Sequence, residues 1–176
     1  MKHTFLQKIM KLFAALTGAV LLLGSHSTQA AYPERPIKFV VPYNAGGGTD
    51  VLSRAVASGV SKILKEPVVV DNRAGASGMI GSDIVARAAP DGYTFVMTAA
   101  DTHTINPHVY PKISYDARKD FVAVARVGYL PYALVVNPQL GITTIKEYIA
   151  LAKKNPGKLT YASWGVGSSS HVAMEM

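Results

Sequence analysis

Two glycine-rich turns contain the residues of this chain that are best suited to binding chemistry. Residues 42–50 (PYNAGGGTD) follow the apolar run 37–41, and residues 71–81 (DNRAGASGMIG) follow the run 68–70. In both, β-branched residues lead through glycines into a helical pattern. Such strand-to-helix turns direct backbone N–H groups and the positive end of a helix at one point, which suits a carboxylate or a phosphate. Two such turns at one sheet edge would form an anion-binding cleft.

Each turn has a simpler interpretation as a ligand-free helix cap, because glycine is common where strands turn into helices. A third glycine-rich turn at residues 165–170 favours the binding interpretation. The turns do not match nucleotide motifs. No Gly-Lys-Ser/Thr follows residues 46–50, and Val51 stands where a dinucleotide fingerprint needs its third glycine.

Catalytic and metal-binding patterns are weak. Ser77 lacks the closing glycine of a hydrolase nucleophile elbow, and the adjacent Ser170 and His171 do not by themselves indicate a catalytic pair. The histidines have no metal-ligand spacing, and the chain has no cysteine. We therefore expect no catalytic residues, no metal and no cofactor.

Three further side chains keep two interpretations each. Arg73 could bind a ligand carboxylate as a bidentate fork, or it could form a surface ion pair with Asp71. Tyr43 and Trp164 lie in glycine-rich turns, which favours contact with a ligand, although core packing is an alternative.

The N-terminus is typical of an export signal. Three lysines precede an apolar stretch at residues 12–23, and residues 28–30 (TQA) resemble a cleavage site. We expect a signal peptide over residues 1–30, cleavage near Ala30 and a periplasmic protein. Removal of the three lysines, with no acidic residue, lowers the net charge from +7 to +4. That mild charge and the absence of basic runs argue against nucleic-acid binding.

The elements that must position the turns alternate between strand and helix. Strands are predicted over residues 37–41, 68–70 and 93–98. Helices are predicted over 49–64, capped by Thr49 or Asp50, and over 77–89. This βαβαβ order favours a parallel α/β sheet.

The second half is less regular. Residues 102–118 are predicted to form a loop with a short helical turn, and residues 121–127, 132–136 and 159–162 to form further strands. A helix with a threonine cap is predicted over 143–154. Because the sequence stops at Met176, about one turn into a further helix, we expect it to be a fragment of a longer polypeptide.

At this point the motifs resemble a family, the Bug-type extracytoplasmic receptors of tripartite tricarboxylate transporters. Beside the leader, the resemblance rests on these segments in order: 32–37 (YPERPI), 41–43 (VPY), 46–50 (GGGTD) with Arg54, 72–81 (NRAGASGMIG), 89–94 (APDGYT), 105–107 (INP), 120–121 (DF), 156–159 (PGKL) and 165–171 (GVGSSSH).

The resemblance implies a type II periplasmic binding protein fold, with ligand held between two lobes that each contain a mostly parallel sheet flanked by helices. The first lobe would span residues 31–128 and the second would start at 129–176, incomplete because family members are about twice this long. The chain would cross between lobes on strands near residues 121–136. The implied ligand contacts are Tyr43, Asn44, Gly46, Gly47, Thr49, Asp50, Ala76, Ser77, Gly78, Ala100, Asp101 and Thr102 from the first lobe, and Ser163, Gly165, Ser168 and Ser169 from the second.

The resemblance also implies a function. The protein would be a monomer that captures a small carboxylate, such as a di- or tricarboxylate or an acidic amino acid, and delivers it to membrane transporter subunits. The alternative is a secreted α/β enzyme acting on an acidic small molecule. Turnover of a carboxylate would distinguish the two.

Overall fold

A three-stranded parallel sheet forms the centre of the structure, a computed structural model that describes residues 32–176. The predicted signal peptide lies outside the described residues. The strands are β1 (Ile37–Val41), β2 (Val68–Asn72) and β3 (Thr94–Val96), in the order β2-β1-β3, with Ile37 opposite Val68 and Lys38 opposite Thr94. The predicted parallel pairing is confirmed. Because all three strands run the same way, their carboxyl ends meet at one edge, beside a switch in strand order at β1.

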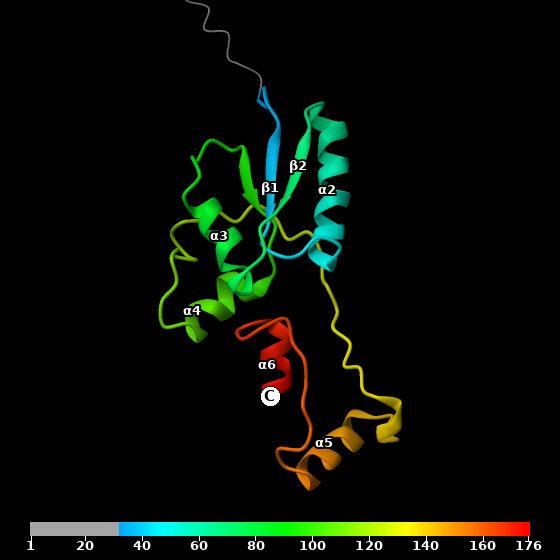
Figure 1. The fold of residues 1–176 in the computed structure, drawn as a ribbon. Helices are drawn as coiled ribbons and strands as arrows, with labels where there is room; N and C mark the ends of the chain where they lie inside the picture. The colour runs from blue at the N-terminus through cyan, green and yellow to red at the C-terminus, as the bar shows by residue number, and fades with distance from the viewer. Residues whose placement is uncertain (1–31) are drawn as a thin grey trace, which may run out of the picture. The chain divides into compact units, whose positions relative to one another are not determined.

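Two helices connect these strands. Helix α2 (Gly48–Leu64) packs against β1 and β2, and α3 (Met79–Ala86) packs against β1 and β3 (Figure 1). A 3₁₀ turn, Ala76–Gly78, precedes α3. Helix α2 ends at Leu64, and its C-cap Lys65 has a left-handed φ of 58°, two residues before Pro67.

The core lies along β1, the central strand, in which every residue except Lys38 is buried. Val40 and Val41 are fully buried, and Ile37 and Phe39 pack with Ala57 of α2. The partly buried neighbours of this cluster are Val56, Leu64, Val68, Val70, Tyr93, Phe95 and Met97. The buried apolar end of this strand, Phe39 to Val41, fixes the position of the turn that follows it.

The remaining elements are short. A π-helical segment, Asp101–Ile105, leads into α4 (Asn106–Val109), and a 3₁₀ turn spans Pro138–Leu140. Helix α5 (Ile145–Lys154) begins with a capping box in which Thr144 and Glu147 bind each other's backbone N–H groups, which confirms the threonine cap. Helix α6 (Ser169–Glu175) follows the third glycine-rich turn.

The strands predicted over residues 121–127, 132–136 and 159–162 are wrong for this structure. The segment 121–136 is extended, but within the part of the chain that the structure describes its backbone makes no hydrogen bond. Its side chains are open to solvent, with Val122 91% and Val135 84% exposed. β-Branched residues favour a strand only where a partner strand is present, and here none pairs with them. No second sheet forms among the described residues.

The predicted cap of α2 is also wrong. The N-cap is Gly47, without a side-chain hydrogen bond, because Asp50 turns its carboxylate inward to other partners.

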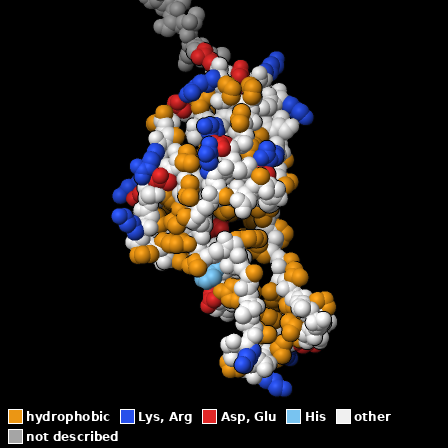
Figure 2. All heavy atoms as spheres, viewed as in Figure 1, with side chains coloured by type: hydrophobic (Ala, Val, Ile, Leu, Met, Phe, Trp, Pro, Cys, Tyr) orange, Lys and Arg blue, Asp and Glu red, His pale blue; other side chains and the backbone are white. Residues whose placement is uncertain are grey.

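Charged side chains of both signs are interspersed on the surface in Figure 2, so this face carries no continuous basic patch. Among residues 32–176, no helix is both long and apolar enough to cross a membrane.

Candidate ligand-binding site

Tyr43 joins the ends of the three strands. Its hydroxyl donates to Asp101 Oδ1 at 3.2 Å and accepts from the Ala99 N–H at 3.3 Å, both beyond β3. Its carbonyl accepts from Asn72 Nδ2, at the end of β2, at 3.1 Å. Burial raises the pKa of the Tyr43 hydroxyl, which therefore stays protonated and remains a donor at neutral pH. These bonds fix the start of the first glycine turn.

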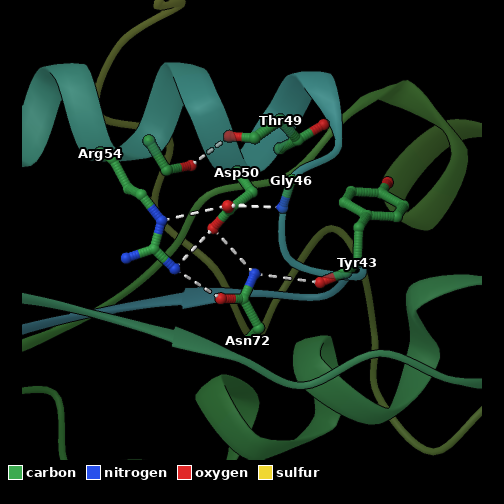
Figure 3. A network of polar contacts seen from close by, with 7 residues as sticks. Tyr43, Gly46, Thr49, Asp50, Arg54 and Asn72 are labelled. Atoms are coloured by element: carbon green, nitrogen blue, oxygen red, sulfur yellow. Dashed lines mark hydrogen bonds and ion pairs between the residues drawn. The ribbon is translucent and has the colours of Figure 1, made fainter.

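Asp50 fixes the rest of that turn from the inside (Figure 3). Its carboxylate is almost fully buried and accepts from the Gly46 N–H at 2.8 Å, from Arg54 Nε at 3.0 Å and from Asn72 Nδ2 at 3.0 Å. The hydrogen bond from Arg54, followed by those from Gly46 and Asn72, lowers the pKa of Asp50 from 3.8 to about 2. In this structure Asp50 holds the backbone of the turn and has no oxygen directed at a ligand.

The first turn leaves a specific group of amides available. The Gly46 N–H is used by Asp50, the Gly47 N–H lies 3.4 Å from the Asn44 carbonyl, and the Val51 N–H makes the first intrahelical bond. Among residues 32–176, the N–H groups of Gly48, Thr49 and Asp50 therefore remain as the unpaired donors at the positive end of α2. Three adjacent donors at a helix N-terminus suit an anion.

The arginines near the turns are already paired. Arg54 bonds Asp50 and donates to Asn72 Oδ1 at 2.9 Å. Arg73 Nε lies 3.0 and 3.1 Å from the two Asp71 oxygens, which favours the ion-pair interpretation over the ligand fork. Because their charges are compensated locally, anion binding here would depend on backbone amides and hydroxyls.

The second turn has an unusual backbone. Ala76, Ser77 and Gly78 have φ angles of 47°, 52° and 83°, all in the left-handed region. Gly78 must lack a side chain, because a Cβ there would lie 2.6 Å from Thr102 Cγ2. The Ser77 carbonyl accepts from Asn106 Nδ2 at 2.9 Å, so α4 helps to hold the turn.

The third turn lies against the second. The carbonyl of Val166 accepts from Ser77 Oγ and from the Tyr110 hydroxyl, each at 2.6 Å. Ser168, which is 2% exposed, caps α6 by accepting from the His171 N–H at 3.2 Å. Residues 89 positions apart in sequence thus meet through a backbone carbonyl.

The structure brings only some of the sequence-predicted site residues together. Three pairs are close: Tyr43 with Asp101, Gly78 with Thr102, and Ser77 with Gly165. Asn44, Gly46 and Gly47 are exposed on the first turn, Thr49 is half-buried at the start of α2, and Ala76 and Ala100 are exposed. Asp50 points into the interior. Ser163 precedes the third turn, whereas Ser168 and Ser169 lie in that turn and at the start of α6.

Sequence reasoning missed four residues that build these turns: Arg54, Asn72, Asn106 and Tyr110. Three of them belong to segments that carried the family resemblance, namely Arg54 itself, 72–81 and 105–107. That association was the available signal. No sequence signal pointed to Tyr110, because its contact with Val166 forms only when the fold brings the third turn close to α4.

A separate pocket of about 580 Å³ lies around His103, Tyr115 and Arg118, and no predicted site residue lines it. Burial lowers the pKa of His103, so its imidazole is neutral at pH 7 and supplies no cation there. Among the described residues, no group of three or more histidine or acidic side chains could hold a metal ion.

Comparison with known proteins identifies the family. Residues 52–176 match the model of the tripartite tricarboxylate transporter family receptor. The chain belongs to this receptor family. It is 36% identical to Protein BugT of Bordetella pertussis over 177 residues, which covers 100% of this chain and 53% of BugT. It is 40% identical to a UPF0065 protein from the tcbD-tcbE intergenic region of Pseudomonas sp. strain P51, covering 90% of this chain and 48% of that one.

Solved structures of receptors confirm the fold class. The chain resembles Rhodopseudomonas palustris Rpa4515 with adipate, at a TM-score of 0.77 and 35% identity, covering 82% of this chain and 48% of that one. It resembles MatC from the same organism with bound malate, at a TM-score of 0.74 and 31% identity, covering 82% of this chain and 49% of MatC. It also resembles the periplasmic binding protein BugD, at a TM-score of 0.65 and 36% identity, covering 81% of this chain and 48% of BugD. The chain spans about half the length of the curated relatives that it matches.

Proposed function

We propose that this receptor-family chain contributes the anion-binding half of a periplasmic solute-binding protein for a small carboxylate. The observation that carries the proposal is the set of unpaired amides of Gly48, Thr49 and Asp50, fixed by the Asp50 network at the carboxyl end of the central strand. The adipate in Rpa4515 and the malate in MatC support a carboxylate as the ligand class.

The chemistry of the turns is adequate for this task. A hydrogen bond to a charged acceptor contributes about 1.5–3 kcal/mol, and a helix N-terminus adds up to about 2 kcal/mol where it is partly buried. Several such contacts, offset by the cost of association, reach the roughly 8 kcal/mol of a micromolar complex. None of these groups is a positioned nucleophile or base, so the ligand is bound and released unchanged.

The protein also has a proposed place in the cell envelope. The protein is exported through the signal peptide at residues 1–30, acts in the periplasm as a monomer and passes its ligand to membrane transporter subunits. The first lobe comprises residues 31–128, and residues 129–176 begin the second lobe. Ligand contacts come from the Gly48 amide and from the sixteen residues named from the family resemblance, with Asp50 contributing its own amide and the backbone that its carboxylate positions.

Isothermal titration calorimetry on residues 31–176 tests the proposal. Adipate and malate are the probes, and dimethyl adipate is the matched uncharged control. We expect at least one acid to bind with a micromolar Kd and 1:1 stoichiometry, and the ester to show no heat. Proton NMR of the mixture after prolonged incubation should show unchanged acid. Equal binding of acid and ester, or consumption of the acid, would contradict the proposal.

A further inference from the structure

A line of polar contacts joins the ends of the strands to the separate pocket around His103. The His103 imidazole lines that pocket, and its Nδ1 lies 2.7 Å from Thr102 Oγ1. Thr102 Oγ1 lies 2.6 Å from Thr98 Oγ1. Thr98 Oγ1 in turn lies 3.5 Å from the Tyr43 hydroxyl oxygen and 3.3 Å from the Ala99 carbonyl oxygen. We call Thr98, Thr102 and His103 the histidine relay.

The direction of the hydrogen bonds in the relay depends on the protonation state of His103. Each threonine hydroxyl has one proton, and an unprotonated imidazole nitrogen accepts one hydrogen bond. When the neutral imidazole has its proton on Nε2, Thr102 donates to Nδ1 and Thr98 donates to Thr102. When the imidazole is protonated, Nδ1 donates to Thr102 and Thr102 donates to Thr98. The Thr98 proton is then directed at the Ala99 carbonyl, so both hydroxyl dipoles have reversed.

The surroundings hold the relay in place. Thr102 is fully buried, and its carbonyl accepts from the Tyr115 hydroxyl at 2.6 Å. The Phe121 ring packs edge-on against the His103 imidazole, with ring centroids 4.4 Å apart. A Cβ on Gly78 would lie 2.6 Å from Thr102 Cγ2, so the second glycine turn closes the other side. A change in protonation therefore turns the hydroxyl protons and leaves the heavy atoms where they are.

Other charges near His103 are balanced or already paired. The titratable and charged side chains that line the same pocket come from α4 and the loop after it: His108, Tyr115, Asp116 and Arg118. Asp116 pairs with Lys119 at 3.4 Å, and Asp101, on the same segment as His103, accepts from the Tyr43 hydroxyl. The 3₁₀ turn Ala76–Gly78, which also packs on this segment, has no titratable side chain. Burial lowers the pKa of His103, and a nearby anion would oppose that effect.

We infer that His103 is a positioning residue that couples carboxylate binding at the first glycine turn to the uptake of a proton in the pocket. In the protonated state, the imidazolium charge is added and the reversed hydroxyl dipoles point their positive ends towards Tyr43 and Ala99. Tyr43 begins the first turn, so an anion bound there favours this state. By linkage, protonation of His103 strengthens binding by the same factor. The inference rests on the proposed carboxylate-binding function.

NMR of the histidine rings in the ¹⁵N-labelled mature chain tests the inference. Residues 31–176 contain three histidines, and single His→Gln variants assign the signals of His103, His108 and His171. Without ligand at about pH 7.5, we expect neutral His103 to have its proton on Nε2. Saturating adipate or malate should increase the proton affinity of His103 about threefold to tenfold, as expected for unit charges about 10 Å apart at a dielectric constant between protein and water. The signals of His108 serve as the internal control, because His108 lines the same pocket outside the relay.

Two variants separate the relay from a simple charge effect. Thr98→Val keeps the branched shape but removes the middle hydroxyl, so the effect of the acid on His103 should fall by at least half. His103→Asn keeps an acceptor for Thr102 but cannot gain a proton. Calorimetry should show that wild type gains affinity relative to His103→Asn between about pH 7.5 and pH 5.5, and a His108→Gln control should behave as wild type. Because the acid titrates equally in every sample, the ratio of Kd values isolates the protein. Circular dichroism checks that each variant folds.

The outcomes separate this inference from the proposed function. If an acid binds but the titration of His103 does not move, or moves equally in Thr98→Val, the inference is overturned and the proposed function stands. A neutral His103 with its proton on Nδ1 would also overturn the inference, because Thr102 could not donate to it. If wild type binds neither acid at any pH tested, the proposed function fails and the coupling fails with it.

Discussion

The carboxylate of Asp50 lies inside the first glycine turn, where it orients the backbone groups that face outward. It takes one amide of the turn, Gly46, and leaves those of Gly48 and Thr49 without partners in the part of the chain that the structure describes. Its charge also neutralises Arg54. The turn can bind an anion although the Asp50 carboxylate is buried beside it. Arg54 compensates the charge of that carboxylate, so the exposed amides keep their positive potential.

A pH-dependent contribution to stability follows from this arrangement. The pKa of Asp50 is lowered from 3.8 to about 2, so the folded state binds its proton less readily than the unfolded chain does. The stabilisation is fully present above about pH 4 and is lost as the pH falls towards 2. We expect Asp50→Asn to lower the free energy of unfolding at pH 7, and the difference from wild type to shrink between pH 4 and pH 2.

Urea unfolding at a series of pH values measures this difference. Asp71→Asn is the matched control, because Asp71 pairs with an exposed Arg73, and such surface pairs contribute at most about 1 kcal/mol. A difference for Asp50→Asn that stays constant down to pH 2 would contradict the assignment.

At this scale the sequence predicted where the turns lie but not what each residue does. Asp50 was expected to cap α2 or to contact the ligand, and its actual partners Arg54 and Asn72 lie four and 22 positions away. The contact of Ser77 with Val166 spans 89 positions. Spacing in a sequence reveals periodic faces and local caps, whereas pairs of this kind depend on how elements approach one another.

At the scale of elements, α3 crosses the end of β1 at a very short distance. A Cβ on Gly81 would lie 2.8 Å from Pro42 Cα and 2.9 Å from the Arg73 carbonyl oxygen, both backbone atoms that cannot move independently. The glycine therefore determines how closely the second turn lies beside the first.

Gly81→Ala should accordingly destabilise the fold. Overpacking against backbone costs about 1–3 kcal/mol, and the displaced α3 would also move Ser77. The control is Gly59→Ala in α2, where a Cβ meets nothing within 4 Å and alanine should stabilise the helix by about 0.5–1 kcal/mol. Urea unfolding of both variants measures the two changes, which should have opposite signs. Equal changes in the free energy of unfolding for the two variants would show that the close crossing of α3 and β1 does not contribute to stability.

The elements also show which patterns a sequence resolves. The βαβαβ order was predicted correctly because each apolar strand of that unit finds its partner within the same unit. The threonine-capped helix α5 was predicted correctly because a capping box is local. The run 121–136 has strand composition too, but its backbone makes no hydrogen bond within residues 32–176, because pairing needs a second strand that composition cannot supply.

At the scale of the whole molecule, the structure combines a hydrogen-bonded sheet with a long extended segment. Backbone groups of β1 bond to β2 on one side and β3 on the other, and Val40 and Val41 are fully buried. In contrast, residues 122–135 are all exposed, and their backbone makes no hydrogen bond to another described residue. Hydrophobic side chains stand along this segment in Figure 2. Local stability should therefore differ sharply between the two regions.

Hydrogen exchange followed by mass spectrometry tests this contrast. Peptides covering residues 37–41 should exchange roughly several thousandfold more slowly than unstructured chain, as expected for a domain stable by about 5 kcal/mol. Peptides covering 122–135 should exchange at the rate of unstructured chain. The internal control is α5, whose intrahelical bonds should give intermediate protection. Strong protection of 122–135 would mean that this segment pairs with a strand in solution, as its β-branched composition suggests, and that the unpaired state is not its dominant one.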